Sequence, residues 1–575
     1  MNESNAEREQ SAWRDALLVA ALATLVIAFF FVTNFRALDQ PDAMKYAQMA
    51  RNFLRGEWFA QEVAYPREFA NRLDGFVASR PTITSAFPQF LAPLVTAVFF
   101  AALGISDHVA AISTAFLYVL SVLFFFLTAR RLLPRKEALL ATTLFGLHGK
   151  IMALAVSGLA EPLFLLLVIL TFYFILRASE RLPFAIGVGL SLAALLFTKD
   201  LAKVFVAVAL AGMPLLIQKK KIAATLLAAA CLVAGYFALA LCQQPTFYDR
   251  PERNIVVSRG RDDPRLVASP PTTLVGKVIE RFGRGGLLLF SSAYPGHTFE
   301  RSINPVRESA FYEHDAAAVI SKWKTNLRVT AWNLWRNLFN PWLLLLFVAF
   351  PLVRRKYSPL LVRLYAWSMI LLGAYFALCV FLFSMYRYLI AALPFAILLA
   401  APVAVSLSER ITSHRAWRTI ALIALAVVCL YPFSLTAGSR TLDVISDPEA
   451  SRLKYADASA MNTLGELLRR RTSRNDVVVC DVPWQAAWRG DRTSIWTPVD
   501  RESLTVLRRR AQVDWLLLTF QDAESALYWR DWLRRFAASG QETMDGFRFA
   551  DGRRAGAHTF YLFRAVAPPD APATP

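Results

Sequence analysis

Long apolar segments separated by short polar ones dominate the pattern along this chain. About eleven of these segments approach the length that an α-helix needs to cross a lipid bilayer. The predicted spans cover residues 16–35, 108–129, 138–156, 162–177, 183–198, 203–217, 222–241, 341–353, 364–383, 387–406 and 417–435. The chain is 56% hydrophobic and only 18% charged, whereas soluble domains carry about 25% charged residues. The pattern therefore predicts a polytopic α-helical membrane protein.

Runs of basic residues between the spans set the expected orientation. Such runs occur at residues 130–136, 219–221 and 354–356, and loops of this kind face the cytoplasm under the positive-inside rule. This assignment requires the apolar stretch 87–103, which Pro88 and Pro93 interrupt, to lie along the outer membrane surface as a helix. The N-terminal segment is then cytoplasmic, and the first span, which has no cleavage site, is retained.

The same topology predicts the domain organisation. Residues 1–15 form a cytoplasmic lead and residues 16–435 a transmembrane domain, with a first outer loop at 36–107 and a long outer loop at 242–340. The long loop is expected to be either a functional lid or a partly disordered connection with interfacial tryptophans. Residues 436–575 alternate strand-like and helical runs, which predicts a small soluble α/β domain outside the cell.

Charge and cysteine usage exclude several function classes. The net charge of +20 falls in short inter-span runs, so nucleic-acid binding is not expected. The five cysteines show no CxxC pairing or disulfide framework, and the six histidines have no spacing typical of a zinc site.

A short amphipathic helix directly follows the first span. It begins at Asp42 behind Pro41, has helical apolar spacing and ends at Gly56. An acid at this place, where a helix N-terminus meets the membrane edge, is suited to binding or deprotonating a polar group. The alternative is a solvated acid that caps the helix.

Ionisable residues near the outer ends of the spans are few. They are Asp42, Lys45, Arg80, Glu161, Lys199, Asp200 and Arg387. Such groups are costly near hydrocarbon unless they are paired or wetted, so they line a cavity or pair with one another. Two acids and several bases on one side of the membrane suit a reaction that deprotonates one group while it holds an anionic leaving group. Interfacial ion pairs that lock span ends together are the alternative.

The order of these motifs resembles the GT-C superfamily of membrane glycosyltransferases. The closest branch contains the protein O-mannosyltransferases and the bacterial lipid A aminoarabinose transferase. Residues 42–47, Asp-Ala-Met-Lys-Tyr-Ala, are similar to the Asp-Glu-x-x-Tyr-Ala helix that follows the first span in that family. The further matches are Arg80-Pro81, Glu161-Pro162, the Phe-Thr-Lys-Asp segment 197–200 and the Tyr-x-x-x-x-Pro element 388–394. The resemblance covers residues 16–435.

The resemblance implies a GT-C fold whose first outer loop carries juxtamembrane helices. It also implies transfer of a sugar from a polyprenyl-phosphate donor to a lipid, glycan or protein acceptor, on the outer face of a bacterial inner membrane and with inversion. Asp42 would be the general base, and Glu161 would orient acceptor or sugar hydroxyls. The lipid phosphate would be held by Arg80, Lys199 and Arg387, while Lys45 and Tyr46 would line the site.

Three departures from the family pattern limit what can be carried over. Ala43 stands where the family has a second acid, Ser79-Arg80 where the aminoarabinose branch has an acid and a lysine, and Asp200 where it has glycine. The sugar and the acceptor are therefore not inferred. The branch works largely without a tightly bound metal, so no cofactor is firmly predicted, although Asp39 and Asp42 could hold a divalent cation.

Two other function classes fit the composition. A transporter or flippase for a lipid-linked glycan would show internal repeats and broken spans with mid-membrane charges, but the charges here lie at span ends. A membrane scaffold with a sensing outer domain would give Asp42, Glu161 and Lys199 no common purpose.

Overall fold

The chain divides into two compact units in a computed structural model. The described residues are 3–57, 60–66, 83–84, 89–217, 220–243, 316–382, 384–411, 414, 416–430, 456–519, 526–539, 541–555 and 558–566. The first unit, here called the helical unit, contains Met1–Leu38, Phe87–Cys242 and Trp323–Pro448. The second, the sheet unit, contains Asp39–Ala86, Gln243–Lys322 and Glu449–Pro575. Residues 39–86, which the sequence assigns to the transmembrane domain, thus group with the C-terminal tail.

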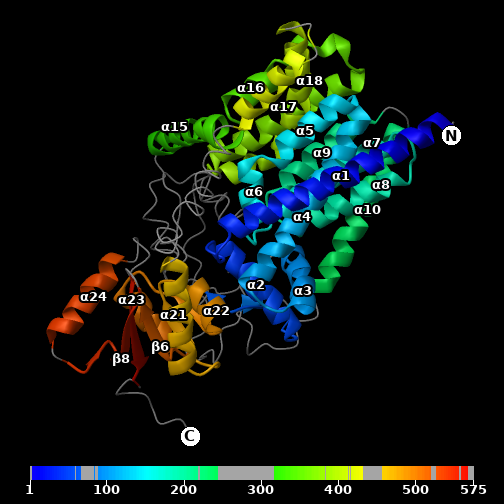
Figure 1. Ribbon diagram of the computed structural model, residues 1–575. Helices are drawn as coiled ribbons and strands as arrows, with labels where there is room; N and C mark the ends of the chain where they lie inside the picture. Colours follow the sequence, from blue (N-terminus) through cyan, green and yellow to red (C-terminus); the bar gives the residue numbers. More distant parts are fainter. Residues whose placement is uncertain are drawn as a thin grey trace. The chain divides into compact units, whose positions relative to one another are not determined.

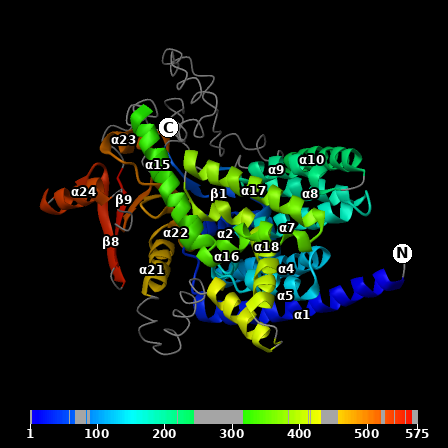
Figure 2. The same ribbon diagram turned by 90° about the horizontal axis from the view of Figure 1, so that it is seen from above.

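The helical unit is built from helices (Figures 1 and 2), most of which are apolar. In chain order they are α1 (Glu3–Asn34), α3 (Leu91–Leu103), α4 (Asp107–Leu132), α5 (Arg135–Gly146), α6 (Gly149–Ala155), α7 (Glu161–Ala178), α8 (Phe184–Leu196), α9 (Ala202–Leu216), α10 (Lys221–Gln243), α15 (Ala316–Trp332, the unit taking it from Trp323), the π-helix η3 (Asn333–Leu338), α16 (Pro341–Val348), the 3₁₀ helices η4 (Phe350–Leu352) and η5 (Arg354–Lys356), α17 (Pro359–Phe381), the 3₁₀ helix η6 (Tyr386–Ala392), α18 (Leu393–Ile411) and a helix at Ala416–Leu430.

Among the described residues, six helices are long and apolar enough to cross a membrane, and the pair α5 and α6, bent by 57°, makes a seventh candidate. The six are Gln10–Asn34, Asp107–Leu132, Glu161–Ala178, Lys221–Ala240, Pro359–Phe381 and Arg387–Ile411. Four shorter apolar helices, Leu91–Leu103, Phe184–Leu196, Ala202–Leu216 and Ala416–Leu430, accompany them. The chain is therefore a polytopic membrane protein, as predicted. The count of eleven crossings stays a prediction.

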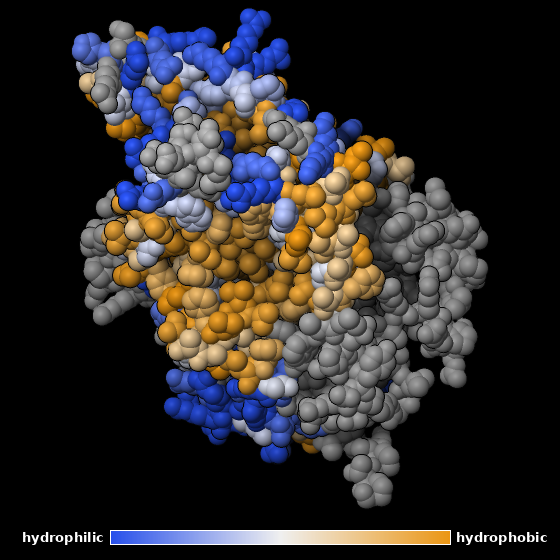
Figure 3. Space-filling view, turned by 90° about the vertical axis from the view of Figure 1, so that its right-hand side faces the viewer, coloured by the Kyte–Doolittle hydropathy of each residue, from blue (hydrophilic) through white to orange (hydrophobic). Residues whose placement is uncertain are grey.

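Burial orders these helices from centre to periphery. The apolar window of α18 is 100% buried, whereas that of α1 is 28% and that of the α10 span 11% buried. Large apolar side chains such as Leu25 and Phe29 on α1 are exposed, and hydrophobic residues cover a broad band of the face in Figure 3. An apolar surface of this extent is what a lipid-facing helix layer requires.

Charged residues close one end of the helical unit. Arg131 at the end of α4 pairs with Glu180 just after α7 at 2.5 Å, and Arg135 at the start of α5 pairs with Asp15 at 2.7 Å. Tyr357, just before α17, donates a hydrogen bond to Glu137 on α5 at 3.1 Å. Since α7 ends at this side, its first residue, Glu161, lies at the opposite end.

The sheet unit contains, within its described residues, a seven-stranded mixed sheet in the order β2-β5-β4-β6-β9-β8-β7. The strands are β2 (Val63–Ala64), β4 (Val477–Cys480), β5 (Thr493–Trp496), β6 (Trp515–Leu518), β7 (Thr543–Met544), β8 (Phe547–Ala555) and β9 (His558–Ala565). The four strands β2, β5, β4 and β6 are parallel, and the other three are antiparallel. The predicted C-terminal α/β domain is thus confirmed.

Helices cover both faces of this sheet. Leu504 of α23 (Arg501–Arg510) and Trp532 of α24 (Ala526–Ser539) pack on one face with Val477 and Val479. On the other face α21 (Ala456–Arg471) and α22 (Pro483–Gly490) pack against Val478 and Cys480. A strand buried on both faces needs apolar residues at successive positions, which explains the run 477–480.

The first outer loop contributes to the same unit. It supplies α2 (Pro41–Leu54), the edge strand β2 and the small ladder of β1 (Ala60–Gln61) with β3 (Ile83–Thr84). Val63 and Ala64 pair in parallel with Ser494 and Ile495 of β5, and Ser494 donates its backbone N–H to Glu62 O at 2.6 Å. The strand β2 from the first outer loop and the strands of the C-terminal domain therefore form one hydrogen-bonded sheet.

Candidate functional site

Glu161 opens α7 at the end of the helical unit away from the basic runs. The N-cap residue, Ala160, makes no side-chain hydrogen bond to the backbone of the first turn. The acid at Glu161 therefore supplies the negative charge that the helix dipole favours at this end. The Glu161 side chain is only 2% exposed. A carboxylate buried this deeply needs cationic or hydrogen-bonding partners.

Two cations meet at one oxygen of this carboxylate. Lys199 Nζ donates a hydrogen bond to Glu161 Oε1 at 2.5 Å, and Arg387 Nη1 lies 3.6 Å from the same atom. Lys199 comes from the turn between α8 and α9, and Arg387 from η6. We call Glu161, Lys199 and Arg387 the acid-centred triad. The sequence placed these three residues on one side of the membrane, and the structure brings their side chains together.

Neighbouring groups hold the two cations in place. The Tyr388 ring lies 5.8 Å from Lys199 Nζ, and the Arg387 Nε–H contacts Met385 Sδ at 3.4 Å. The turn that carries Lys199 is anchored by Tyr375, whose hydroxyl donates to Leu201 O at 3.0 Å. These contacts reduce the freedom of long cationic side chains, which lowers the entropy that binding an anion would cost.

Asp200, the departure from the family glycine, has a local role. Its Oδ2 accepts a hydrogen bond from Gln89 Nε2 at 3.1 Å, and Oδ1 lies 3.7 Å from Lys203 Nζ. In the same place Leu91 N–H donates to Phe197 O at 3.3 Å. Asp200 thus ties the Lys199 turn to the start of α3.

One carboxylate between two cations leaves the acid-centred triad with a net charge of +1. Lys199 and Arg387 keep 14% and 21% of their side chains exposed, whereas the Glu161 side chain is 2% exposed, so the cations and not the carboxylate face the surroundings of the site. Preorganised cations in a poorly solvated place bind phosphate oxygens and stabilise developing negative charge. The geometry is therefore suited to an anion such as a phosphate group.

The second group of predicted residues lies on α2 in the sheet unit. Gln40 is the N-cap and Asp42 lies in the first turn, so the alternative that Asp42 is the capping residue is wrong. Asp42 and Lys45 are half-buried and Tyr46 is buried. The helix covers Pro41–Leu54, two residues short of the Gly56 at which the sequence ends it, and Gly56 has a positive φ of 79°.

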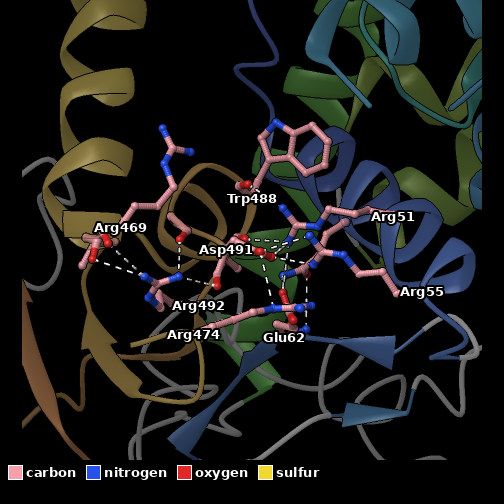
Figure 4. Close-up of polar contacts among 12 residues, drawn as sticks. Arg51, Arg55, Glu62, Arg469, Arg474, Trp488, Asp491 and Arg492 are labelled. Atoms are coloured by element: carbon pink, nitrogen blue, oxygen red, sulfur yellow. Dashed lines mark hydrogen bonds and ion pairs between the residues drawn. The ribbon is translucent and has the colours of Figure 1, made fainter. Parts of the chain in front are cut away.

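The C-terminal half of α2 is held by residues that the sequence did not single out. Arg51, Arg55, Glu62, Trp488 and Asp491 form a network of hydrogen bonds and ion pairs (Figure 4). Arg51 lies in the last turn of α2 and Arg55 directly follows the helix, but their partners in the tail are 436 or more positions away. No local pattern could have revealed them.

Two predicted residues add nothing to this geometry. Arg80 lies outside the described residues. Asp39 is exposed, and among the residues that the structure describes no group of three or more His, Cys, Asp or Glu side chains could hold a metal ion.

Comparisons with known proteins bear on the fold. No family model matches the sequence, and no curated protein matches it. A crystal structure of ArnT from Cupriavidus metallidurans bound to undecaprenyl phosphate, however, aligns with 95% of this chain and 97% of its own, at 12% identity and a TM-score of 0.51. The chain therefore has the fold of ArnT. The resemblance predicted from the order of motifs is thereby confirmed at the level of the fold.

Two further solved structures match less closely. ArnT from the same organism in the apo state gives a TM-score of 0.49 at 12% identity, with 95% and 97% of the two chains covered. The archaeal oligosaccharyltransferase AglB from Archaeoglobus fulgidus, in complex with an inhibitory peptide and a dolichol-phosphate, gives 0.46 at 11% identity, with 89% of this chain and 71% of AglB covered. At such identities a match shows the fold alone.

Proposed function

We propose that this GT-C protein transfers a sugar from a polyprenyl-phosphate donor to an acceptor on the outer face of a bacterial inner membrane. The observation that carries the proposal is the acid-centred triad, which offers one net positive charge at the ends of apolar helices. A polyprenyl phosphate needs this combination, because its phosphate is anionic and its chain is apolar. The fold shared with a protein solved with undecaprenyl phosphate supports the same donor class.

The chemistry is a single displacement. The bond between the anomeric carbon and the donor phosphate oxygen breaks, and polyprenyl phosphate leaves with the electron pair. A new bond forms from the acceptor nucleophile to the anomeric carbon with inversion, and the acceptor proton passes to Asp42 as general base. The negative charge that builds on the leaving phosphate is stabilised by Lys199 and Arg387.

The contacts of Glu161 favour a positioning role for it. Both cations share its Oε1 atom and its side chain is buried, so Glu161 sets where the Lys199 ammonium and the Arg387 guanidinium lie. In this scheme Lys45 and Tyr46 line the acceptor side on α2, and Arg80 is a further phosphate contact. The acceptor is a lipid, a glycan or a protein, and the N-terminus is cytoplasmic with the tail periplasmic.

The deciding experiment measures release of polyprenyl phosphate from a panel of polyprenyl-phosphate sugars by purified wild-type protein and by Asp42→Asn. We expect release from one donor by the wild type and a loss of about 100-fold or more in the variant, because general-base catalysis contributes 10²–10⁴-fold. Asp39→Asn is the companion variant. A loss there that added magnesium restores would assign Asp39 and Asp42 to a cation instead.

The result that overturns the proposal is equally definite. No release from any donor, with wild type and Asp42→Asn binding the lipid-linked glycan equally well, would leave a transporter or flippase as the function.

A further inference from the structure

Arg51, near the end of α2, is held by groups of the C-terminal domain and by Glu62 of the first outer loop. Its Nη1 donates to Trp488 O at 2.8 Å and its Nη2 to Ala487 O at 2.9 Å. The same guanidinium lies 3.1 Å from Glu62 Oε2 and 3.1 Å from Asp491 Oδ1. The Arg51 side chain is 6% exposed. Two carbonyls and two carboxylates thus fix both the position and the rotation of one planar group.

A second arginine one helical turn further on makes a parallel contact. Arg55 forms a two-point pair with Asp491, with Nη1 2.7 Å from Oδ1 and Nη2 3.0 Å from Oδ2. Asp491 ends α22 in the left-handed conformation, with φ 56°, which Asp tolerates better than most residues. The carboxylate of Asp491 therefore receives both arginines of α2 (Figure 4).

The C-terminal domain keeps this end of α22 rigid. Arg492 is buried and donates to Thr472 Oγ1 at 2.6 Å, to Thr472 O at 2.7 Å and to Gly490 O at 2.9 Å. Arg474 adds an ion pair to Asp491 at 3.6 Å. The surface that receives Arg51 and Arg55 is therefore itself braced against α21.

Glu62 connects the same helix to the sheet. Its Oε2 accepts from Gln48 Nε2 at 3.1 Å as well as from Arg51, and the next residue, Val63, begins β2. Asn52 Nδ2 also donates to Ala60 O at 3.0 Å. Residues 48–55 of α2 are thus fastened to the sheet, while Asp42 lies at the other end of a helix that rises about 1.5 Å per residue.

We propose that Arg51, with Glu62 and Asp491, positions α2 and thereby Asp42, so that the C-terminal domain sets the rate of the transfer reaction without touching the substrates. This inference rests on the proposed function. Arg51 is a positioning residue, because Asp42 lies nine positions earlier and Arg51 itself is enclosed by protein groups. A helix held at one end acts as a rigid arm, and a displacement of about 1 Å at a catalytic group can cost about 100-fold in rate.

The test compares three variants of the full-length protein. Arg51→Ala removes the central contact. Arg55→Ala removes the outer one, and because the Arg55 side chain is 30% exposed, we expect this variant to fold. Arg508→Ala is the matched control, since Arg508 also forks onto two backbone carbonyls, Asp545 O at 2.6 Å and Val566 O at 2.9 Å, but does so far along the sheet from α2.

Two readouts separate positioning from general destabilisation. Hydrogen exchange should become faster in α2 in Arg51→Ala and Arg55→Ala, while β4 and β6 keep their protection. Polyprenyl phosphate release should show kcat lowered by about 100-fold in Arg51→Ala and by less in Arg55→Ala, with the KM for the donor within about threefold of wild type. Arg508→Ala should leave both α2 exchange and kcat as in the wild type.

Each contrary result would overturn one part of the proposal on Arg51. Wild-type kcat in Arg51→Ala together with faster α2 exchange would overturn the positioning role, and unchanged α2 exchange in both variants would overturn the anchoring. A fall in kcat in Arg508→Ala as large as in Arg51→Ala would reduce the effect to overall stability. If the wild type releases no polyprenyl phosphate, the proposed function fails, and the exchange data still decide whether Arg51 anchors α2.

Discussion

Lys199 Nζ lies 2.5 Å from Glu161 Oε1, although 38 residues separate them. The carboxylate is 2% exposed and receives Arg387 as well. Because this buried carboxylate holds two cations, its loss would change both the stability of the protein and the net charge of the acid-centred triad.

Glu161→Gln should destabilise the protein by about 1.5–3 kcal/mol, the cost of losing hydrogen bonds to a charged group. The cost stays below that of a fully buried pair because Lys199 and Arg387 reach solvent. Thermal unfolding in detergent measures it. Glu180→Gln is the control, since Glu180 is 53% exposed in its pair with Arg131 and should change stability by about 0–1 kcal/mol. Equal effects in the two variants would contradict the special status of Glu161.

Lys199→Met should lower kcat/KM for polyprenyl phosphate release by about 100-fold, because the triad then has no net charge to stabilise the leaving phosphate. The neighbouring variant Asp200→Asn can keep its hydrogen bond with Gln89 and should stay within about twofold of wild type. A comparable loss in Asp200→Asn would mean that the turn, and not the ammonium, matters for the reaction.

Acid should release α2 from the C-terminal domain. Burial alone would raise the pKa of Asp491, but the hydrogen bonds from Arg55 and the charges of Arg51, Arg55 and Arg474 hold this pKa below its usual 3.8. Since the folded pKa is depressed, the stabilisation is fully present above pH 3.8 and is lost as the pH falls below that value. The protection factors of the α2 amides should fall in this acid range, and Asp491→Asn should show the lower protection already at pH 7. The same pH profile in Asp491→Asn as in wild type would exclude Asp491 as the titrating group.

Gly212→Ala should destabilise the helical unit by about 1–3 kcal/mol, the usual cost of overpacking. A methyl group on Gly212 in α9 would collide with the indole of Trp367 in α17, and Trp367 is itself buried and hydrogen-bonded to Val208 O at 3.0 Å. Gly373→Ala, also within α17, meets nothing within 4 Å and should be neutral or stabilising by up to about 1 kcal/mol. Thermal unfolding of the two variants side by side makes the comparison.

Most of the fold could be predicted from local sequence patterns. Each predicted span overlaps an apolar helix, although 138–156 falls on the bent pair α5 and α6 and 341–353 on the short helix α16 followed by η4. The tail strands at Val477 and Trp515 were visible as apolar runs because both faces of their sheet are covered. The motif order 42–394 was enough to indicate the GT-C fold although identity to the matching structure is only 12%. Period and composition are properties of neighbouring residues, so a sequence displays them.

Contacts between distant segments were not predictable in the same way. Val63 and Ala64 show no strand pattern, since two residues have no period, yet they complete the sheet beside Ser494. The meeting of Glu161 with Lys199 and Arg387 followed from topology only as far as a common side of the membrane. Which acid pairs with which base depends on how the helices pack, and the order of residues in the sequence does not determine that packing for a reader.

The parallel pairing of Val63 with Ser494 means that this edge of the sheet can form only late in synthesis of the chain. The ribosome must add about 430 residues after β2 before β5 exists, which at about 5–20 residues per second takes roughly 20–90 seconds. Throughout that interval β2 and the arginines of α2 lack the strand and the carboxylate that hold them. A chain that stops before residue 491 contains every helix of the helical unit but lacks the carboxylate and the strand that hold α2 and β2, so only the C-terminal segment can complete this part of the sheet unit.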